Sequence, residues 1–373
     1  MAISNPFITN GYLSPHYFCD REKETKLLTD FIINGNNVAL ISPRRLGKTG
    51  LIHHCFNQES LKNNYYTFIV DIYATKNLQE LVYELGKTVL GTLKSKGRKA
   101  WELFLNTLGS LRGSVTFDIN GNPEWGFGVG DIRVPQATLD EIFDYLEKAD
   151  KPCVVAIDEF QVIANYPEKN VEAILRTHIQ KCRNAWFVYA GSQRHLMTEM
   201  FVLPSRPFYQ SVMLMSIQPI EQDRYVEYAQ RLFREYEKEV TSDTVVAVYQ
   251  RYEGVTWYIQ AVLNALFAIT PKGGVCKADM LDVAIQQIIT QQSFAYNTLL
   301  YQLPPKQKEV LMAICREGKA QAVTSRAFLK KYRLTASTVQ GAVKGLLDKD
   351  LVTHDLGTYT LYDQFFAQWL LRS

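Results

Sequence analysis

Short runs of apolar residues recur along the first 220 positions of this 373-residue chain. Each run is short and largely continuous, which is typical of a strand in a parallel sheet that is covered on both faces. Five such runs are predicted to form strands, over residues 38–41, 66–73, 153–157, 185–191 and 212–217. Segments with apolar residues at helical spacing follow the first run and precede the fourth. The pattern predicts an α/β fold with a parallel sheet at its core.

The loop after the first predicted strand has the sequence SPRRLGKTG, residues 42–50. Gly47, Lys48 and Thr49 match the end of the phosphate-binding pattern G-x-x-x-x-G-K-[ST], and Ser42 takes the place of its first glycine. Between a strand and a helix, such a loop surrounds phosphates with backbone N–H groups, its lysine reaches the β and γ phosphates, and its hydroxyl holds magnesium. The predicted nucleotide-binding residues are Ser42, Pro43, Arg44, Arg45, Leu46, Gly47, Lys48, Thr49 and Gly50. The alternative, a basic turn before a helix, is disfavoured by the flanking strand and helix.

Two carboxylates, Asp158 and Glu159, directly follow the third predicted strand. A phosphate loop of this type needs a carboxylate that anchors magnesium at the end of a neighbouring strand. Asp158 is therefore predicted to hold the metal through water, and Glu159 to polarise the attacking water. The alternative is a solvated strand end. One predicted strand, 66–73, separates the phosphate-loop strand from the Asp158 strand in sequence, as in P-loop ATPases that carry an added catalytic glutamate.

Polar residues also follow the fourth predicted strand. Ser192, Gln193 and Arg194 come directly after the run 185–191. Ligands of open α/β sheets bind at the carboxyl ends of the strands. These three side chains are therefore predicted to face the γ-phosphate and to be catalytic together with Lys48 and Glu159.

Several stretches, taken in order, resemble the archaeal-type ATPase family, a branch of AAA+-like and STAND ATPases. They are YFCDREKE (17–24), SPRRLGKTGL (42–51), AIDEFQVIA (156–164), YAGSQRHLM (189–197) and RPFYQSVMLMSIQPI (206–220). GVTWYIQAVLNAL (254–266) is similar to the lid motif of that family, and YTLYDQFFAQWLL (359–371) to its C-terminal signature. The resemblance implies a P-loop NTPase core, a helical lid and a C-terminal winged helix-turn-helix, with ATP and Mg²⁺ as cofactors.

Four residues depart from the pattern of that family. Asp20 replaces a glycine, Ser42 the first loop glycine, Thr256 the lid proline, and Ser211 stands where many members carry an arginine. The last two positions bear on how the γ-phosphate is sensed. The resemblance therefore implies ATP binding more directly than fast hydrolysis, and a slow nucleotide-binding switch or scaffold stays open as an alternative.

The helix expected over residues 170–182 places Arg176 and Arg183 on its polar side. Glu172 and Arg176, four residues apart, are expected to form a surface ion pair. Arg183 is the better candidate for an arginine that reaches the nucleotide of a neighbouring subunit, as AAA+ subunits often do, so a nucleotide-dependent oligomer is possible. Arg194 resembles the arginine with which STAND ATPases read the γ-phosphate; the alternative is a helix cap or a surface ion pair.

The domain organisation is expected to be an ATPase core over residues 1–220, a helical lid over 221–302 and a winged helix over 303–373. The core contains an insert at about 78–135, with helices over 78–108 and a hairpin over 113–130 that turns at Asn120-Gly121-Asn122. This insert is a lid, a partner surface or surface decoration. In the last part, three helical segments and a hairpin turning at Asp355-Leu356-Gly357 predict the winged helix, with Thr335 as the N-cap of the third helix.

The winged helix suggests DNA, and residues 305–373 carry 11 Lys or Arg against 6 Asp or Glu. The outer face of its third helix offers only Ser337, Gln340, Lys344 and two glycines, a poor set for reading bases. Basic side chains that could hold phosphates precede it, namely Arg326, Lys330, Lys331 and Arg333. Any binding to duplex DNA is thus expected to be weak and independent of sequence. One alternative is a DNA-associated initiator-like ATPase whose winged helix and lid bind duplex DNA. The other is a winged helix that packs against the ATPase core as a regulatory or partner-binding element.

The composition of the chain is typical of a cytoplasmic protein. The formal net charge is +3, so no overall basic field demands nucleic acid. The six cysteines include no C-x-x-C pair, which predicts reduced core residues and neither disulfides nor a metal site. The first residues lack the pattern of a signal peptide, and no apolar stretch reaches the length of a membrane span. A cytoplasmic protein without membrane segments is expected.

Overall fold

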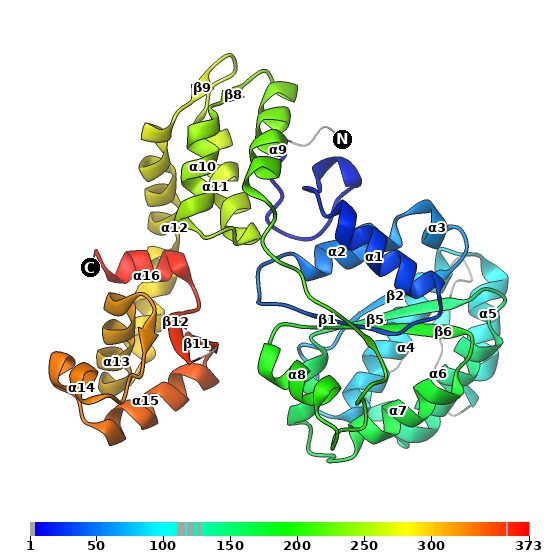
Figure 1. Cartoon of the computed structure of the whole chain (residues 1–373). Helices are drawn as coiled ribbons and strands as arrows, with labels where there is room; N and C mark the ends of the chain where they lie inside the picture. Colours follow the sequence, from blue (N-terminus) through cyan, green and yellow to red (C-terminus); the bar gives the residue numbers. More distant parts are fainter. Residues whose placement is uncertain (1–3, 110–115, 118–122, 125–127, 356, 373) are drawn as a thin grey trace. The chain divides into compact units, whose positions relative to one another are not determined.

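The computed structural model describes residues 4–109, 116–117, 123–124, 128–355 and 357–372. The chain divides into two compact units, Asn10–Ile220 and Glu221–Ser373, and the first nine residues belong to the second unit (Figure 1). Asn5 and Asn264 fix this N-terminal segment, because the Asn5 side chain donates to the carbonyl of Asn264 and the Asn264 side chain donates to the carbonyl of Phe7. The Phe7 ring is buried. The expected domain 1–220 thus differs from the unit in the structure by its first nine residues.

The N-terminal unit is built on a five-stranded sheet in the order β2-β5-β6-β1-β7, and every neighbouring pair is parallel. The strands are β1 (Val38–Ile41), β2 (Tyr66–Asp71), β5 (Cys153–Asp158), β6 (Ala185–Gly191) and β7 (Met213–Met215). All five predicted strands are confirmed, although β2 and β7 are shorter than the apolar runs that predicted them. Because β6 lies between β1 and β5, its carboxyl end is flanked by the phosphate loop on one side and by Asp158 on the other.

Helices cover both faces of this sheet (Figure 1). On one face, α1 (Glu22–Ile33) and α2 (Lys48–Phe56) pack with Val154 and Ala156 of β5. On the other face, the alternate residues Val155 and Ile157 belong to a larger core. That core includes helices α4 (Leu78–Lys94), α5 (Arg98–Thr107), α6 (Pro135–Lys148), α7 (Val171–Lys181) and α8 (Arg194–Val202). All six residues of β5 are buried, as its continuous apolar sequence predicts.

Short elements complete this unit. Helix α3 (Glu59–Lys62) and the 3₁₀ helices η1 (Pro15–Tyr17), η3 (Val129–Asp131) and η4 (Phe160–Asn165) lie in connections. In the insert, α4 and α5 confirm the predicted helices, and β3 (Thr116–Phe117) pairs antiparallel with β4 (Pro123–Glu124). This pairing confirms the predicted hairpin. Its predicted turn at Asn120-Gly121-Asn122 lies outside the described residues.

The C-terminal unit starts with a helical part. Its elements are α9 (Gln222–Glu235), β8 (Glu239–Val240), α10 (Ser242–Arg251), α11 (Thr256–Ile269), β9 (Val275–Cys276), η5 (Ala278–Met280) and α12 (Leu281–Gln302). The two short strands pair in parallel. Tyr228, Phe233 and Phe267 surround Phe7 with ring centroids 5.5 to 6.0 Å away, so the N-terminal segment is part of this core.

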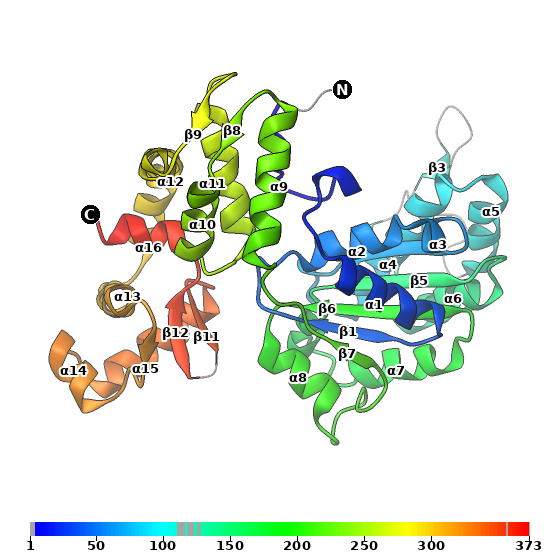
Figure 2. The ribbon, with the colours of Figure 1, turned by 45° about the horizontal axis from the view of Figure 1, so that its top comes forward.

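The winged helix follows in the same unit (Figure 2). It consists of α13 (Pro305–Glu317), β10 (Ala320–Gln321), α14 (Arg326–Tyr332), α15 (Ala336–Asp348), β11 (Val352–Asp355), β12 (Thr358–Leu361) and α16 (Gln364–Leu370). The three strands form a sheet in the order β10-β12-β11. The Thr335 hydroxyl accepts a hydrogen bond from the N–H of Thr338 and caps α15, as predicted. The predicted hairpin is confirmed by the antiparallel pairing of β11 and β12, and Leu356 of its turn lies outside the described residues.

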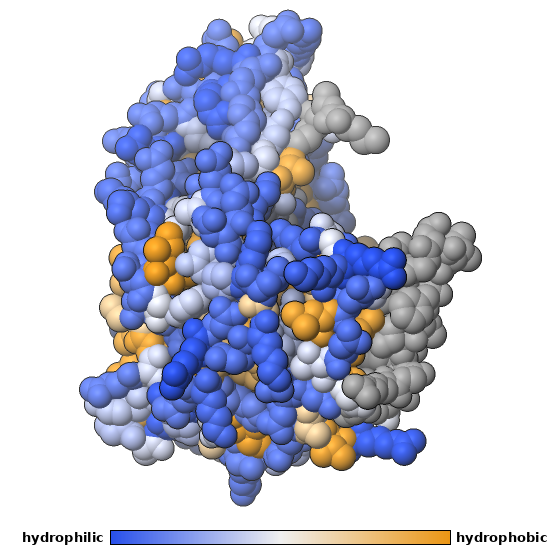
Figure 3. All heavy atoms as spheres, turned by 90° about the vertical axis from the view of Figure 1, so that its right-hand side faces the viewer, coloured by the Kyte–Doolittle hydropathy of each residue, from blue (hydrophilic) through white to orange (hydrophobic). Residues whose placement is uncertain are grey.

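The surface drawn in Figure 3 is largely hydrophilic, and hydrophobic residues occur on it as small separate patches. Within the described parts of the chain, none of the helices combines the length and the apolar character that crossing a membrane requires.

Candidate functional site

The phosphate loop joins the carboxyl end of β1 to the first turn of α2. Gly47 has φ 92° and ψ 27°, a left-handed conformation that glycine adopts without strain. Ser42 is fully buried, and its N–H donates to the carbonyl of Gly191 at 3.5 Å. Positive φ angles occur at Arg45 and Gly47 but not at Ser42. A glycine is therefore not required at the first position of the loop, which explains why serine is compatible with this geometry.

Lys48 lies at the amino end of α2 and is almost completely buried. Its Nζ donates to the carbonyl oxygens of Ser42 at 3.0 Å and Pro43 at 3.2 Å. Burial lowers the pKa of Lys48 to about 8, although the nearby Glu159 and Asp158 act in the opposite direction. The ammonium group is thus held within the loop and close to two carboxylates, where the charge of a phosphate would favour its protonated form.

Asp158 and Thr49 bring two oxygen ligands together. The Thr49 hydroxyl donates to Asp158 Oδ2 at 2.5 Å, and the other carboxylate oxygen accepts the N–H of Glu159 at 3.0 Å. Burial raises the pKa of Asp158, and the hydrogen bond from Thr49 opposes this shift. A hydroxyl beside a carboxylate at the end of a strand suits Mg²⁺, which prefers oxygen ligands. Within the described residues no group of three or more His, Cys, Asp and Glu side chains could hold a metal by itself.

Glu159 lies at the turn between β5 and η4 in a left-handed conformation, with φ 55° and ψ 39°. Such a conformation costs a non-glycine residue of order 1–3 kcal/mol and is found most often at functional sites. Its Oε2 accepts hydrogen bonds from Ser192 Oγ at 2.7 Å and from Gln161 Nε2 at 2.5 Å. Ser192 Oγ in turn accepts from Arg44 Nε at 3.0 Å. The phosphate loop, the end of β6 and the second carboxylate thus form one hydrogen-bonded network.

The other predicted site residues divide into two groups. Gln193 is the N-cap residue of α8 and Arg194 its first residue, so both lie at the carboxyl end of β6 beside Ser192. Arg183 does not lie at this edge. The prediction that Arg183 is part of the helix is wrong, because α7 ends at Lys181 and Cys182 is in an extended conformation. Arg183 is exposed at the amino end of β6, at the opposite edge of the sheet, where its backbone N–H donates to Glu147.

The expected pair between Glu172 and Arg176 is not formed. Glu172 instead pairs with Arg206, which connects α7 to the segment after α8. Arg206 comes 34 positions later than Glu172, and this contact outcompetes the local pair because both partners lie in a partly buried position.

Arg21 is a residue of the site that the sequence motifs did not indicate. Its guanidinium is 3% exposed and donates to the carbonyl of Leu46 at 3.1 Å and to the carbonyl of Gln218 at 2.6 Å. A salt bridge with Glu24 balances its charge. Arg21 therefore connects the phosphate loop to the segment that leaves β7. The only signal in the sequence is its place in the stretch YFCDREKE, which the family resemblance includes.

Aromatic rings from the segment before α1 pack against α2. Phe18 and His54 are stacked with centroids 4.4 Å apart, and a side chain on Gly50 would lie 3.3 Å from the Phe18 ring. The Tyr12 hydroxyl lies 3.1 Å from Nδ1 of His54. Phe18 and Tyr12 thus both contact the side chain of His54, which lies in the last turn of α2. The sequence motifs did not indicate these contacts of Tyr12 and Phe18.

Comparison with protein families decides the assignment. Residues 18–262, about two thirds of the chain, match the family described as an ATPase domain predominantly from Archaea. The chain belongs to this family. Residues 294–372 match a second family, described as a probable winged helix domain. The predicted resemblance and the predicted fold class are both confirmed.

Solved structures of similar fold include other P-loop ATPases. The chain has a TM-score of 0.65 and 17% identity with the Walker-type ATPase paby2304 of Pyrococcus abyssi, over 98% of this chain and 99% of that one. The Aeropyrum pernix ORC1 protein, solved in complex with DNA, has a TM-score of 0.55 and 13% identity, over 99% and 96%. The Aeropyrum pernix ORC2 protein, solved as ADPNP-ADP complexes, has a TM-score of 0.53 and 12% identity, over 99% and 98%. At these identities the likeness concerns the fold alone. No curated protein sequence matches the chain significantly.

The winged helix of this chain carries charged and polar side chains at its surface. Ser337, Gln340 and Lys344 are exposed on α15, as predicted. Lys331, however, pairs with Glu317 at 2.7 Å, and the Tyr332 hydroxyl donates to the same carboxylate oxygen. The hydrogen bond from Lys331 lowers the pKa of Glu317. One of the four basic side chains expected to contact phosphates is therefore held by an acidic neighbour.

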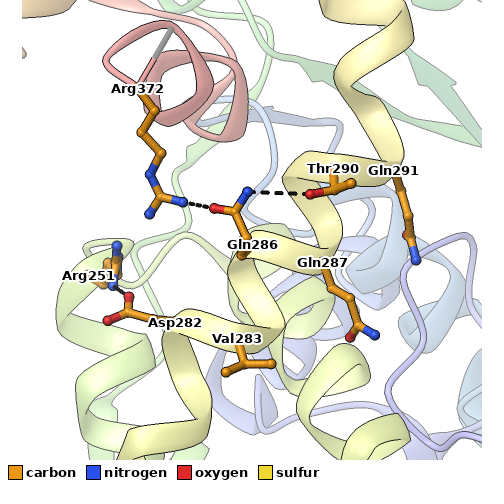
Figure 4. A pocket seen from close by; sticks show the side chains of 8 residues that line it. All are labelled: Arg251, Asp282, Val283, Gln286, Gln287, Thr290, Gln291 and Arg372. Carbon is orange, nitrogen blue, oxygen red and sulfur yellow. Dashed lines mark hydrogen bonds and ion pairs between the residues drawn. The ribbon is translucent and has the colours of Figure 1, made fainter.

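A separate open groove of about 910 Å³ lies in the C-terminal unit, along α12 (Figure 4). Its charged side chains are engaged within the protein. Arg251 pairs with Asp282 at 2.7 Å, and Arg372 donates to the amide oxygen of Gln286. The groove therefore lacks the features that the phosphate loop offers to an anionic ligand.

Proposed function

We propose that this chain binds Mg-ATP at the phosphate loop and hydrolyses it slowly, with Glu159 as the general base. The supporting observation is the convergence of Lys48, the Thr49–Asp158 pair and the Glu159–Ser192–Arg44 network at the carboxyl ends of β1, β5 and β6. A carboxylate next to a phosphate loop is the arrangement that activates water in ATPases with an added glutamate.

In this proposal each group has a separate task. Backbone N–H groups at the start of α2 and the Lys48 ammonium bind the β and γ phosphates. The Thr49 hydroxyl and Asp158 would hold Mg²⁺, which neutralises phosphate charge when bound. Glu159 accepts a proton from water as the water oxygen bonds to the γ-phosphorus and the bond to the β-phosphate oxygen breaks, giving ADP and inorganic phosphate. Ser192 and Arg194, at the end of β6, contact the γ-phosphate side of the site.

The proposal also includes a route by which nucleotide binding at the phosphate loop affects the C-terminal unit. Arg21 bonds both to Leu46 of the phosphate loop and to Gln218, three residues before the C-terminal unit begins at Glu221. A change in the loop on nucleotide binding is thus transmitted to the segment that leads into the helical lid. In this proposal, which follows the switching of AAA+ and STAND ATPases, the binding of ATP changes which partners the winged helix can contact. Arg183 is exposed and is free of any role in its own site, so it would act only on the nucleotide of a neighbouring copy.

Measurement of ATP turnover tests this function directly. Purified protein should release phosphate from Mg-ATP with a single site per chain, and calorimetry should find ATP bound with a stoichiometry of one. Protein that neither binds nor hydrolyses ATP would exclude the proposal. Binding without release of phosphate over hours would favour the slow switch or scaffold instead.

A second candidate function is association with duplex DNA. It is favoured by the exposed face of α15, the helix that enters the major groove in winged helix proteins that bind DNA. The pairing of Lys331 with Glu317 weighs against a large number of phosphate contacts. Repeating the turnover assay with and without duplex DNA distinguishes the two functions.

A further inference from the structure

Gln161 is a buried amide whose contacts point to the second carboxylate of the site. It follows Glu159 by two positions and lies in η4. Its side chain is 2% exposed, and Nε2 donates to Glu159 Oε2. No hydrogen-bond partner of Gln161 Oε1 exists among the described residues. Burying an amide whose oxygen has no hydrogen-bond partner destabilises the folded protein. The hydrogen bond to Glu159 is therefore the contact that indicates a function for Gln161.

The surroundings of Gln161 are shaped to accept this side chain. A side chain on Gly191, the last residue of β6, would lie 2.6 Å from Gln161 Oε1 and would also collide with Met197 of α8. Gly191 therefore has no room for any larger residue. Its N-terminal neighbours in β6 are fully buried, so the wall on that side is rigid. The Gln161 amide is confined between β6 and α8 and can reach Glu159 in a defined direction.

The two hydrogen bonds to Glu159 fall on the same oxygen. Oε2 accepts from both Gln161 and Ser192, whereas Oε1 accepts no hydrogen bond from the described part of the chain. Two donors on one oxygen fix the rotation of the carboxylate and leave the other oxygen available for a proton from water. Because Ser192 also binds Arg44, this anchor is attached to the phosphate loop.

We propose that Gln161 is a positioning residue for Glu159. Together with Ser192 it anchors Oε2, so that Oε1 is directed at the attacking water during ATP hydrolysis. Gln161 does not touch the nucleotide and acts only through Glu159. The inference rests on the proposed function and adds to it the residue that determines the orientation of the base.

The test compares Gln161→Met with the wild type under steady-state conditions. Methionine keeps the length of the side chain and removes both the donor and the unpaired oxygen. We expect kcat to fall roughly 10- to 100-fold, the usual effect of losing a group that orients a reacting one, while KM and the affinity for ATP change less than about threefold. Gln161→Ala, which cannot overpack the site, should show the same split if the methionine variant does not fold. Gln79→Met is the matched control, because Gln79 donates to the backbone carbonyls of Val129 and Ile132 away from the site.

A double-mutant cycle excludes a merely structural role. In a protein that already carries Glu159→Gln, the change Gln161→Met should lower the residual rate by less than about twofold, because the group that it orients is gone. An equal loss of rate in both backgrounds, or a rise in KM at unchanged kcat, would overturn the inference while leaving the ATPase function intact. Absence of turnover in the wild type itself would overturn both.

Discussion

The charged groups around the phosphate loop are buried and bonded to one another, whereas those of the winged helix are exposed and contact nearby residues. Lys48 and Asp158 are each 6% exposed, and the latter bonds to Thr49. In the winged helix, by contrast, Lys331 pairs with Glu317 and Lys306 with Glu309, all at the surface. Isolated buried charges cost several kcal/mol, whereas surface ion pairs contribute about 0–1 kcal/mol.

This difference separates buried charged groups, whose burial is unfavourable for stability, from surface charges that have little effect on it. Lys48 and Asp158 are buried beside the partly buried Glu159, an arrangement that is typical of functional sites. The exposed side chains of α14 and α15 are compatible with solvent alone. Substitutions in the two regions should therefore have effects of very different size.

The largest effect is expected for Lys48→Ala. Removal of the ammonium facing the β and γ phosphates should weaken ATP binding by roughly 10²-fold or more, since truncation of a buried charged partner costs 2–5 kcal/mol. Lys62→Ala, at an exposed lysine of α3, is the matched control and should bind as the wild type does. Calorimetry checks both variants, and an unchanged affinity in Lys48→Ala would show that ATP binds elsewhere.

The winged helix should respond less, and only in the presence of DNA. Each phosphate contact contributes a slope of about 0.9 when log affinity is plotted against log salt. Replacing Arg326, Lys330 and Arg333 by alanine should flatten this slope by at most about 3 units, and Lys331→Ala should add less because Glu317 already holds that lysine. Neither change should alter ATP affinity.

Fluorescence anisotropy with a labelled duplex at several salt concentrations measures these slopes. The matched control replaces Lys306, Lys308 and Lys319, which removes the same charge from another part of the winged helix. If the control flattens the slope as much as the test variant, the contacts are not specific to α14. Absence of salt-dependent binding by the wild type would assign the winged helix to a protein partner or to regulation.

The smallest effect concerns pH. Burial brings the pKa of Lys48 to about 8, and bound phosphate would raise it, since the protonated amine is the form that binds. ATP affinity should thus be nearly constant from pH 7 to 8 and then fall, by up to about tenfold per pH unit, as the free protein loses this proton. Titrations in buffers of different ionisation enthalpy should show proton uptake on binding above pH 8. An affinity that stays constant to pH 9.5 would contradict the role of Lys48.

Sequence alone predicted those parts of the molecule that depend on local pattern. The continuous apolar residues of β5 are typical of a strand buried on both faces, and the loop between β1 and α2 follows from a motif within ten residues. The Thr335 cap was predictable for the same reason, because its partner Thr338 is three positions away.

Contacts between distant segments were not predictable in this way. Arg21 donates a hydrogen bond to Gln218, which lies 197 positions away. Glu172 forms its salt bridge with Arg206 and not with Arg176, which is nearer in sequence. Gln161 is close to Glu159 in sequence, but its role depends on the space that Gly191 leaves on another strand. The N-terminal segment around Phe7 belongs to the C-terminal unit because the Phe7 ring packs against Phe233 and Phe267 in the core of that unit. In each instance tertiary packing determines the interaction partner, which the local sequence pattern does not specify.

The most direct test of the central claim is single-turnover hydrolysis of ATP bound to the wild type and to Glu159→Gln. The exchange is nearly isosteric and leaves Thr49 and Asp158 unchanged, so both proteins should bind Mg-ATP with the same affinity. The variant should release phosphate roughly 10²-fold more slowly, the usual scale for removal of a general base. Glu59→Gln, at an exposed residue of α3, should behave as the wild type does. Equal rates for wild type and Glu159→Gln would contradict the assignment of this carboxylate as the base.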